Sequence, residues 1–362
     1  MQFFSGSSFF RQRIVLSLLT SLPITISDIR SKSTSPGLRD FEASFLRLID
    51  KFTNGTQITV DETGTKVVFR PGHITGGRLV HNCGNSRPIG YFLEMIVCLA
   101  PFAKNETSIK LKGITNGKPD ISVDFFKNVI INNLKKFGFE TEDNIIGRPM
   151  SLKIHRRGTS PLGNGEIRFT CPIVKKLDPL ILLKEGKCNK MRGIAFTTRI
   201  SPQISNRMVK TTRTVMTNFL NDIHIYTDHY SGKQSDTSPG FGISLVAKTT
   251  RNCFYGVDCV GEKGQVAEDI ASECCKRILN EITIGGVVDS SSQWVMALFM
   301  VICSEDVSKI RIGKLNKYTI GWLRALKTFF GVTFQIQPDS KTKTVLLSCK
   351  GVGLKNISRK FN

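Results

Sequence analysis

Basic residues gather where a loop leads into a predicted helix near the start of the chain. Arg30, Lys32 and Arg39 flank a Pro-Gly turn, and an amphipathic helix follows. The first turn of a helix has unpaired backbone N–H groups and the positive end of the helix dipole, which both favour an anion. The pattern therefore predicts a phosphate or carboxylate contact, although a solvated basic loop gives the same pattern.

Two further segments carry groups that could bind anions or transfer protons. His155, Arg156 and Arg157 end a predicted strand, where they could contact phosphate or form an exposed hairpin tip. Asp228 and His229 are adjacent, a pairing that acid–base catalysis can use. No nucleophile or metal ligand stands at a supporting spacing. We therefore expect Asp228 and His229 to lie in a turn or at a partner contact, and we expect no metal site.

The charge balance points to a polyanionic partner. The chain has 362 residues with 51 Lys and Arg against 29 Asp and Glu, and its formal net charge is +22. This excess favours nucleic acid as the partner class, with a membrane surface as the alternative. No polybasic amphipathic helix and no apolar run of ~20 residues stands out, so we expect no membrane partner. The ten cysteines lack zinc or redox spacing, which favours reduced structural thiols in the cytosol or nucleus.

A repeated pattern of helix, strand and strand must position these residues. It occurs at 45–72, at 128–172 and at 320–351. Each helix has apolar residues at the 3.6-residue period, and each strand alternates apolar and polar residues. Three such units predict an α/β (α+β) fold whose sheets pack outward around shared helices in one large domain. Residues 187–284 differ in character and predict a smaller inserted α/β domain, which leaves 1–186 and 285–362 as the core of three repeats.

Several segments resemble the RNA 3'-terminal phosphate cyclases. They are "RQRIVLSLLTSLPITISDIR" at 11–30, "FRPG" at 69–72, "EKGQVAED" at 262–269 and "GGVVDSSSQ" at 285–293. The segments "SPGLRDFEASFLRL" at 35–48 and "EDVSKIRIGKLNKYTI" at 305–320 are similar to the eukaryotic cyclase-like branch of that family. The resemblance runs from residue 9 to residue 360, and it implies three repeats with an inserted domain.

The resemblance also implies that cyclase chemistry has been lost. True cyclases use a histidine to take AMP from ATP, and the best-aligned position here is Tyr318, whereas all five histidines lie elsewhere. A phenol with a pKa of about 10 is a poor substitute for that nucleophile at neutral pH. The nucleotide pocket differs too, since Phe9 and Phe10 replace small or polar residues and Glu94 stands where the family has Gln. We therefore expect no catalytic residue for cyclisation and no cofactor.

The cyclase-like branch implies a function in ribosome assembly. Its members are nucleolar factors of the small-subunit processome, so the resemblance implies a non-catalytic factor required for early pre-rRNA processing. It implies nucleolar localisation, and it implies a nucleolar ribosome-biogenesis GTPase, pre-rRNA and processome components as partners. The alternative is a pre-rRNA endonuclease on the same scaffold, because some members carry an Arg-Asp-x-Lys pattern proposed to cleave precursor rRNA. Here Ala325 replaces the Asp. Arg324 and Lys327 therefore remain only as weaker candidates for RNA binding.

A cyclase-like arrangement of the sheets predicts one anion site made of five arginines. They are Arg13, Arg30, Arg39, Arg156 and Arg157, with no offsetting carboxylate except Asp40. Such a group would repel itself unless RNA phosphate or an acidic partner segment were bound, and the planar guanidinium grips phosphate bidentately. The hypothesis predicts that Arg30→Ala with Arg39→Ala leaves thermal stability unchanged or slightly raised. It also predicts at least about tenfold weaker binding of RNA or the GTPase.

Overall fold

The computed structural model describes residues 1–139, 141, 144–231 and 238–356. The α-helices are α1 (Phe10–Thr20), α2 (Asp40–Phe52), α3 (Ile89–Leu99), α4 (Val123–Phe125), α5 (Ile131–Leu134), α6 (Gln203–Met216), α7 (Ala267–Ile284), α8 (Gln293–Ile302) and α9 (Lys317–Phe330). The other helical segments of the described residues are the 3₁₀ turns η1 (Ala100–Phe102) and η3 (Lys135–Phe137) and the π-helical turn η2 (Phe126–Ile130).

Among the described residues, the strands pair into four larger sheets and two short ribbons. Those of the first half are β1 (Gln2–Ser5), β2 (Ile24–Ser27), β3 (Thr53–Asn54), β4 (Gln57–Val60), β5 (Val67–Arg70), β6 (His73–Ile74), β7 (Gly76–Asn82), β8 (Asn105–Gly113), β9 (Ile145–Ile146), β10 (Ser151–Arg156) and β11 (Gly165–Cys171). The others are β12 (Ile173–Val174), β13 (Ile181–Leu182), β14 (Cys188–Thr198), β15 (Ile223–Tyr230), β16 (Gly240–Thr249), β17 (Phe254–Val260), β18 (Val307–Ile312), β19 (Gln335–Asp339) and β20 (Thr344–Lys350).

Three of the four-stranded sheets have the same strand order. They are β1-β2-β5-β4, β7-β8-β11-β10 and β13-β18-β20-β19. In each sheet the first two strands are parallel and the other pairs are antiparallel. A parallel pair needs a long crossover, which α1, α3 and α8 supply. The predicted α/β class is confirmed, and each observed unit adds a parallel strand pair to the predicted helix, strand and strand.

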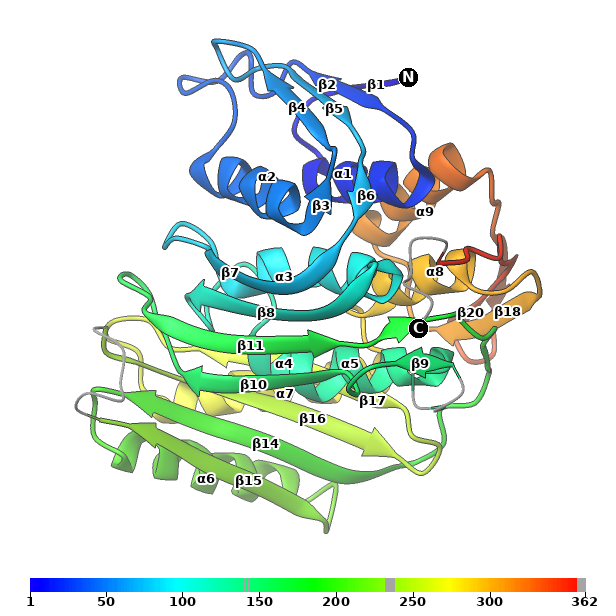
Figure 1. Cartoon of the computed structure of the whole chain (residues 1–362). Helices are drawn as coiled ribbons and strands as arrows, with labels where there is room; N and C mark the ends of the chain where they lie inside the picture. Colours follow the sequence, from blue (N-terminus) through cyan, green and yellow to red (C-terminus); the bar gives the residue numbers. More distant parts are fainter. Residues whose placement is uncertain (140, 142–143, 232–237, 357–362) are drawn as a thin grey trace.

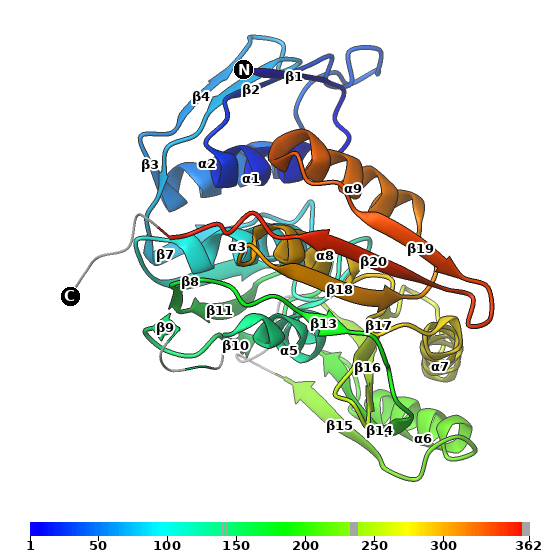
Figure 2. The same ribbon diagram turned by 90° about the vertical axis from the view of Figure 1, so that its right-hand side faces the viewer.

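The main core lies between these sheets. Every residue of α3 and of α8 is buried, as expected for helices that are apolar all round. Helix α1 packs on α3 and α9, and α9 packs on α8. The rings of Trp294 and Trp322 meet edge to face at 5.8 Å in this core. Figure 2 shows α1 and α9 beneath the first sheet, with α3 and α8 below them.

The residues between β13 and α8 form a fourth sheet. Its strand order is β15-β14-β16-β17, and α6 and α7 pack against it and against each other. Its buried apolar residues form a core of their own, from Met191 to Ile278 in the chain. This sheet is the lower part of the molecule in Figure 1. The limits 187 and 284 of the inserted domain stay a prediction, and residues 357–362 of the predicted core lie outside the described residues.

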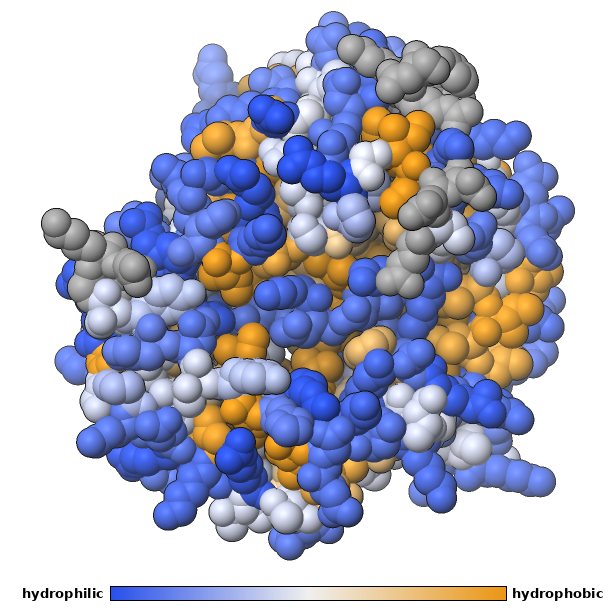
Figure 3. Space-filling model, turned by 60° about the horizontal axis from the view of Figure 1, so that its bottom comes forward, coloured by the Kyte–Doolittle hydropathy of each residue, from blue (hydrophilic) through white to orange (hydrophobic). Residues whose placement is uncertain are grey.

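The cysteines are reduced and the surface is mostly polar, as the composition predicts. All ten cysteines are free, and nine of them are buried. Burial raises the pKa of the Cys83 and Cys98 thiols, which keeps them protonated and inert. The face drawn in Figure 3 is mostly hydrophilic, with hydrophobic residues in separate patches. Within the described part of the chain, no helix has the length and apolar content needed to cross a membrane.

Candidate functional site

Tyr318, the residue that the resemblance places at the position of the cyclase histidine, lies at the start of α9. Asn316 caps this helix, because its side-chain oxygen accepts a hydrogen bond from the Thr319 backbone N–H at 2.7 Å. The Tyr318 hydroxyl accepts a hydrogen bond from Gln12 Nε2 at 2.8 Å, and the Tyr318 ring stacks on Phe9 with 5.3 Å between centroids. Burial raises the pKa of the Tyr318 hydroxyl well above its usual range. The hydroxyl therefore stays protonated at neutral pH, which makes it a poor nucleophile.

A buried ion pair lies beside Tyr318. Arg11 of α1 donates to the carboxylate of Glu94 on α3 and to the backbone carbonyl of Tyr91. The Arg11 guanidinium also sits 4.3 Å from the centre of the Tyr91 ring. Burial raises the pKa of Glu94, although Arg11 opposes this shift. Arg11, Glu94 and Tyr318 line a small pocket of about 260 Å³. Glu94 thus neutralises Arg11 within the protein.

Arg13 and Arg39 make local contacts. Arg13 Nη1 donates to the Gly6 carbonyl at 3.0 Å, and its guanidinium lies 4.6 Å from the centre of the Phe4 ring. Burial lowers the pKa of Arg13. Arg39 Nη1 donates to Ser35 Oγ at 2.8 Å on the exposed loop before α2. Each of these two arginines is therefore held by contacts with residues close to it in the sequence.

Arg30 has a carboxylate partner that the sequence prediction missed. Its two terminal nitrogens each donate to a different oxygen of Glu42, both at 2.7 Å. Glu42 also accepts the Arg39 backbone N–H at 2.8 Å and so closes the first turn of α2. The hydrogen bond with Glu42 raises the pKa of Arg30. The expectation of no offsetting carboxylate except Asp40 is wrong, because Glu42 neutralises Arg30.

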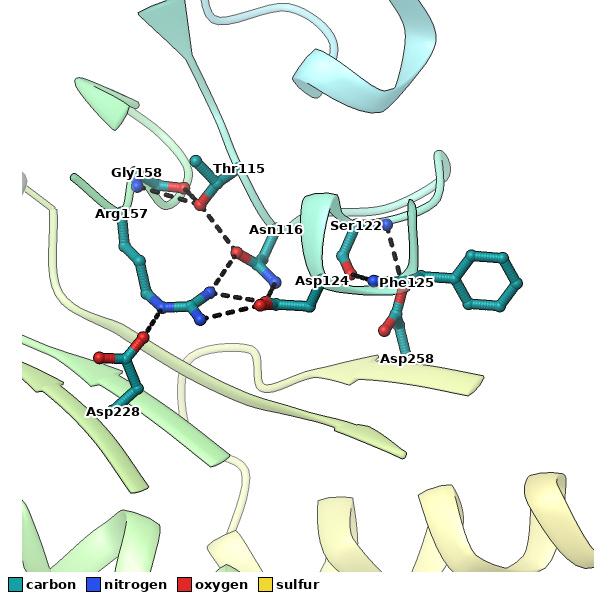
Figure 4. A network of polar contacts seen from close by, with 9 residues as sticks. All are labelled: Thr115, Asn116, Ser122, Asp124, Phe125, Arg157, Gly158, Asp228 and Asp258. Atoms are coloured by element: carbon teal, nitrogen blue, oxygen red, sulfur yellow. Dashed lines mark hydrogen bonds and ion pairs between the residues drawn. The ribbon is translucent and has the colours of Figure 1, made fainter. Parts of the chain in front are cut away.

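Arg157 is the centre of a buried network at the junction of the two cores (Figure 4). Its guanidinium donates twice to Asp124, at 2.6 and 2.9 Å, and Nε donates to Asp228 at 2.7 Å. It also donates to Asn116 at 3.1 Å and lies 4.8 Å from the centre of the Phe196 ring. Burial lowers the pKa of Arg157, but Asp124 and Asp228 raise it more, so the net shift is upward.

This network joins elements of different parts of the chain. Arg157 follows β10, and Asp124 is in α4, so both belong to the main core. Asp228 is on β15 and Phe196 on β14, in the inserted sheet. The side chain of Arg157 is 1% exposed. A buried guanidinium with two carboxylates holds the inserted sheet on the core and has no free face for RNA.

The single five-arginine anion site is therefore wrong. Arg30 and Arg39 adjoin the first sheet and α2, whereas Arg156 ends β10 of the second sheet and Arg157 follows it, in a different layer of the molecule (Figure 1). Arg156 Nε donates to the Asn164 carbonyl at 2.6 Å across its own hairpin. Asp228 and His229 lie on strand β15, so they do not form a turn, and their predicted contact with a partner stays a prediction. Whether Arg13, Arg39 or Arg156 binds RNA separately stays a prediction.

The weaker candidates Arg324 and Lys327 lie on the exposed side of α9. They are three residues apart and so share one face of the helix. Ala325 between them packs partly against the core. Neither cation has an ion-pair partner among the described residues. Both remain available for a phosphate, and their binding of RNA stays a prediction.

Sequence reasoning missed that carboxylates neutralise the candidate arginines Arg30 and Arg157. Glu42 stands three residues after Arg39, which is a helix-capping spacing and could have signalled its role. Asp124 and Asp228 could not be paired with Arg157 from one sequence, because they lie 33 and 71 residues away in the chain. In the ranges that the structure describes, no group of three His, Cys, Asp or Glu side chains could hold a metal ion.

Known proteins resemble the chain over nearly its whole length. The sequence model of the family described as RNA 3'-terminal phosphate cyclase matches residues 2–336. The chain is 44% identical over 372 residues to a probable RNA 3'-terminal phosphate cyclase-like protein of Dictyostelium discoideum, which covers 98% of each protein. It is 44% identical over 367 residues to the RNA 3'-terminal phosphate cyclase-like protein of Homo sapiens, covering 98% of this chain and 97% of the human protein.

A further relative carries a functional name. The chain is 39% identical over 361 residues to the rRNA processing protein rcl1 of Schizosaccharomyces pombe, covering 99% of this chain and 98% of that protein. The family match spans most of the chain, and these relatives match over nearly their full lengths. The chain therefore belongs to the RNA 3'-terminal phosphate cyclase family and groups with its cyclase-like members.

Proposed function

We propose that the chain is a non-catalytic factor required for early processing of pre-rRNA to small-subunit rRNA. One relative of full matching length is named an rRNA processing protein, which supports this function. The contacts of Tyr318 are the observation that supports the absence of cyclase catalysis. Its hydroxyl accepts a hydrogen bond from Gln12 and its ring stacks on Phe9, beside a pocket lined by the Arg11–Glu94 pair. Covalent transfer of AMP needs a reactive nucleophile, and a protonated phenol is a poor one.

In this proposal the protein acts by binding. Its partners are pre-rRNA, other components of the small-subunit processome and a nucleolar ribosome-biogenesis GTPase, and it works in the nucleolus. The net charge of +22 supports the RNA contact. The GTPase and the location rest on the resemblance to the cyclase-like branch. Affinity capture of the tagged protein from nucleolar extract, with and without RNase, tests whether a GTPase is retained without RNA.

The absence of adenylation is tested with purified protein. Labelled ATP and an RNA with a 3'-phosphate are added, and we expect neither a labelled protein nor a cyclic phosphate. Tyr318→His is the informative variant, because it restores the nucleophile in an otherwise unchanged pocket. We expect it to stay unlabelled, since the Glu94 carboxylate still lines the pocket and Phe9 still packs beside residue 318. Labelling of the unaltered protein would overturn the proposal, and scission of a pre-rRNA fragment that Arg324→Ala abolishes would favour the endonuclease.

A cellular test distinguishes a structural role of the Tyr318 ring from a chemical role of its hydroxyl. The protein is depleted, and small-subunit rRNA precursors are followed by hybridisation. Tyr318→Phe keeps the ring that stacks on Phe9 and removes only the hydroxyl that Gln12 contacts. We expect it to restore processing as well as the unaltered protein does. Loss of processing at normal protein levels would show that the hydroxyl takes part in a reaction.

A further inference from the structure

We propose that the open face of the β7-β8-β11-β10 sheet binds the phosphate backbone of RNA. This inference rests on the proposed function and names the surface that would carry its RNA contact. The surface, here called the basic sheet face, consists of Lys110, Lys112, Arg148, Lys153, His155 and Arg168 with the hydroxyl residues between them. None of these residues belongs to the predicted arginine site or to the pocket beside Tyr318.

Strand register places three cations side by side on this face. Lys153 on β10 is directly opposite Arg168 on β11, and Arg168 is directly opposite Lys110 on β8. Side chains of directly opposed residues project from the same face, and neighbouring strands lie about 4.8 Å apart. The three cations therefore form a row about 10 Å long across the sheet. Their neighbours along the strands, such as Leu152 and Phe169, are buried on the opposite side.

The row faces solvent. Lys153 and Arg168 of the row are exposed, as are Lys112 and His155 beside it, and Lys110 at the end of the row is half-buried. Figure 1 shows the sheet in front, with α4 and α5 behind it, and Figure 2 shows the same arrangement from the side. The helices thus cover only the apolar face, and the basic face is left without a covering element among the described residues.

The positive charge of the face is only partly neutralised within the protein. Lys110 pairs with Glu166 at 2.7 Å, and Arg148 lies 3.5 Å from Glu106. The hydrogen bond from Lys110 lowers the pKa of Glu166, and Lys110, Lys112 and His155 add to the shift through their charge. Lys153 and Arg168 have no ion-pair partner among the described residues. Like charges directly opposite one another destabilise a sheet, so this pair gains from a bound anion.

A hollow in the same face is lined by cations and hydroxyls. It measures about 390 Å³, and its lining includes Arg148, Lys153, His155 and Arg168. Ser151 and Thr170 also line it, and their hydroxyls share a hydrogen bond of 2.7 Å. No carboxylate lines this hollow. Cationic and hydroxyl donors around one depression suit the oxygen atoms of a phosphate group.

The composition of the face favours RNA over an acidic protein. The outward positions of these four strands, which the structure describes completely, include no Phe, Tyr or Trp. Protein interfaces depend on a few buried apolar or aromatic anchors, whereas backbone contacts to nucleic acid need charge and hydrogen-bond donors. Without Phe, Tyr or Trp the face offers little surface for stacking bases, so we expect binding with little sequence preference and strong salt dependence.

The test removes the positive charges of Lys153 and Arg168 and is designed to leave the fold of the sheet intact. Lys153→Glu with Arg168→Glu changes two exposed side chains in the hollow. The matched control is Lys210→Glu with Arg213→Glu, which makes the same change in net charge on the exposed side of α6. Fluorescence anisotropy with a single-stranded RNA oligonucleotide of mixed sequence gives the affinity at several salt concentrations. Thermal unfolding checks both variants, and Lys153→Gln with Arg168→Gln replaces the first variant if that one unfolds.

We expect the sheet variant to bind the RNA at least about tenfold more weakly and the control to differ less than about twofold. We also expect the slope of log affinity against log salt to fall by about 1.4, because each single-strand phosphate contact contributes about 0.7. Equal weakening by both variants, unchanged binding by the sheet variant, or absence of RNA binding by the unaltered protein would each overturn the inference. Loss of binding to an acidic peptide with RNA binding intact would overturn it in favour of a protein partner.

The outcome is separable from that of the proposed function. If depletion of the protein blocks pre-rRNA processing and the sheet variant restores it fully, the basic sheet face is not needed, although the proposed function stands. If depletion leaves processing normal, the proposed function fails whatever the oligonucleotide shows.

Discussion

Replacement of Arg157 by Met should destabilise the protein strongly. Met fills much of the same volume, but it removes the guanidinium that neutralises Asp124 and Asp228. The Asp124 side chain is 0% exposed and loses two hydrogen bonds, of 2.6 and 2.9 Å. Removal of one partner of a buried ion pair costs about 3–5 kcal/mol, because the other charge stays buried without compensation. We expect the free energy of unfolding at pH 7 to fall by that amount.

The two carboxylates should contribute unequally. The Asp228 side chain is 33% exposed and can be solvated when the pair is broken. Asp228→Asn should therefore cost no more than about 1 kcal/mol, in the range of exposed ion pairs. Addition of Asp124→Asn to Arg157→Met should recover about 2–3 kcal/mol, since it removes the uncompensated charge.

The dependence on pH provides a second check with a definite sign. Burial raises the pKa of Asp124, but Arg157 opposes it more strongly, and the net pKa is lowered in the folded protein. This contribution to stability is present above the unfolded pKa of about 4 and is lost as the pH falls through the folded pKa. Without Arg157, burial should raise the pKa of Asp124 in the folded protein. At lower pH the variant then protonates Asp124 and no longer buries an uncompensated charge. The stability difference between the two proteins should shrink between pH 7 and about pH 5.

Equilibrium unfolding in urea gives these free energies. Both tryptophans, Trp294 and Trp322, are buried in the main core, so their fluorescence reports that core alone, and far-UV circular dichroism reports the inserted sheet as well. Separate transitions by the two probes in the variant would indicate that the junction has lost its coupling. A loss below about 1 kcal/mol, or a loss that is the same at both pH values, would refute the uncompensated-charge argument.

Three further predictions follow from single contacts. Lys153→Glu, which turns its like-charged pairing with Arg168 into an opposite-charged one, should raise the free energy of unfolding by about 0.2–1 kcal/mol, measured in urea. Burial, helped by Lys51 and Arg47, lowers the pKa of His81 to about 4. Stability should therefore fall as the pH drops from about 6.5 to about 4, where only the unfolded state takes up this proton, and His81→Gln should remove that part of the slope. Arg30→Ala should cost about 1.5–3 kcal/mol because Glu42 loses its cation, and a melting temperature that stays unchanged would restore the original expectation for this arginine.

Sequence reasoning identified the elements with clear periodicity. The amphipathic helices α2, α6 and α9 and the alternating strands β10 and β11 were predicted close to where they lie. Helices α3 and α8 were missed as crossovers, because a helix buried on all sides has no amphipathic period. The parallel pairs that they connect were missed for the same reason.

The candidate site was harder to predict than the fold. Tyr318 was located through the family resemblance, and the structure adds its contacts with Gln12 and Phe9. The arginines were judged by their charge alone, and charge does not reveal partners that are remote in the chain. Asp228 reaches Arg157 only because the inserted sheet folds back on the core. The basic sheet face was invisible for a related reason, since its cations are dispersed over three strands and meet only through register.

Contacts between the first and last elements affect how the chain can fold during synthesis. The Phe4 ring stacks on Phe329 at 5.6 Å, and Gln2 donates to the Thr328 carbonyl at 3.2 Å, so the first unit packs on α9. The third sheet also pairs Ile181 with Lys309 across the whole inserted domain. Such long-range contacts form late and slowly. The nascent first unit must therefore leave apolar surface open until α9 leaves the ribosome, and a chain that ends before α9 should be held by chaperones or aggregate.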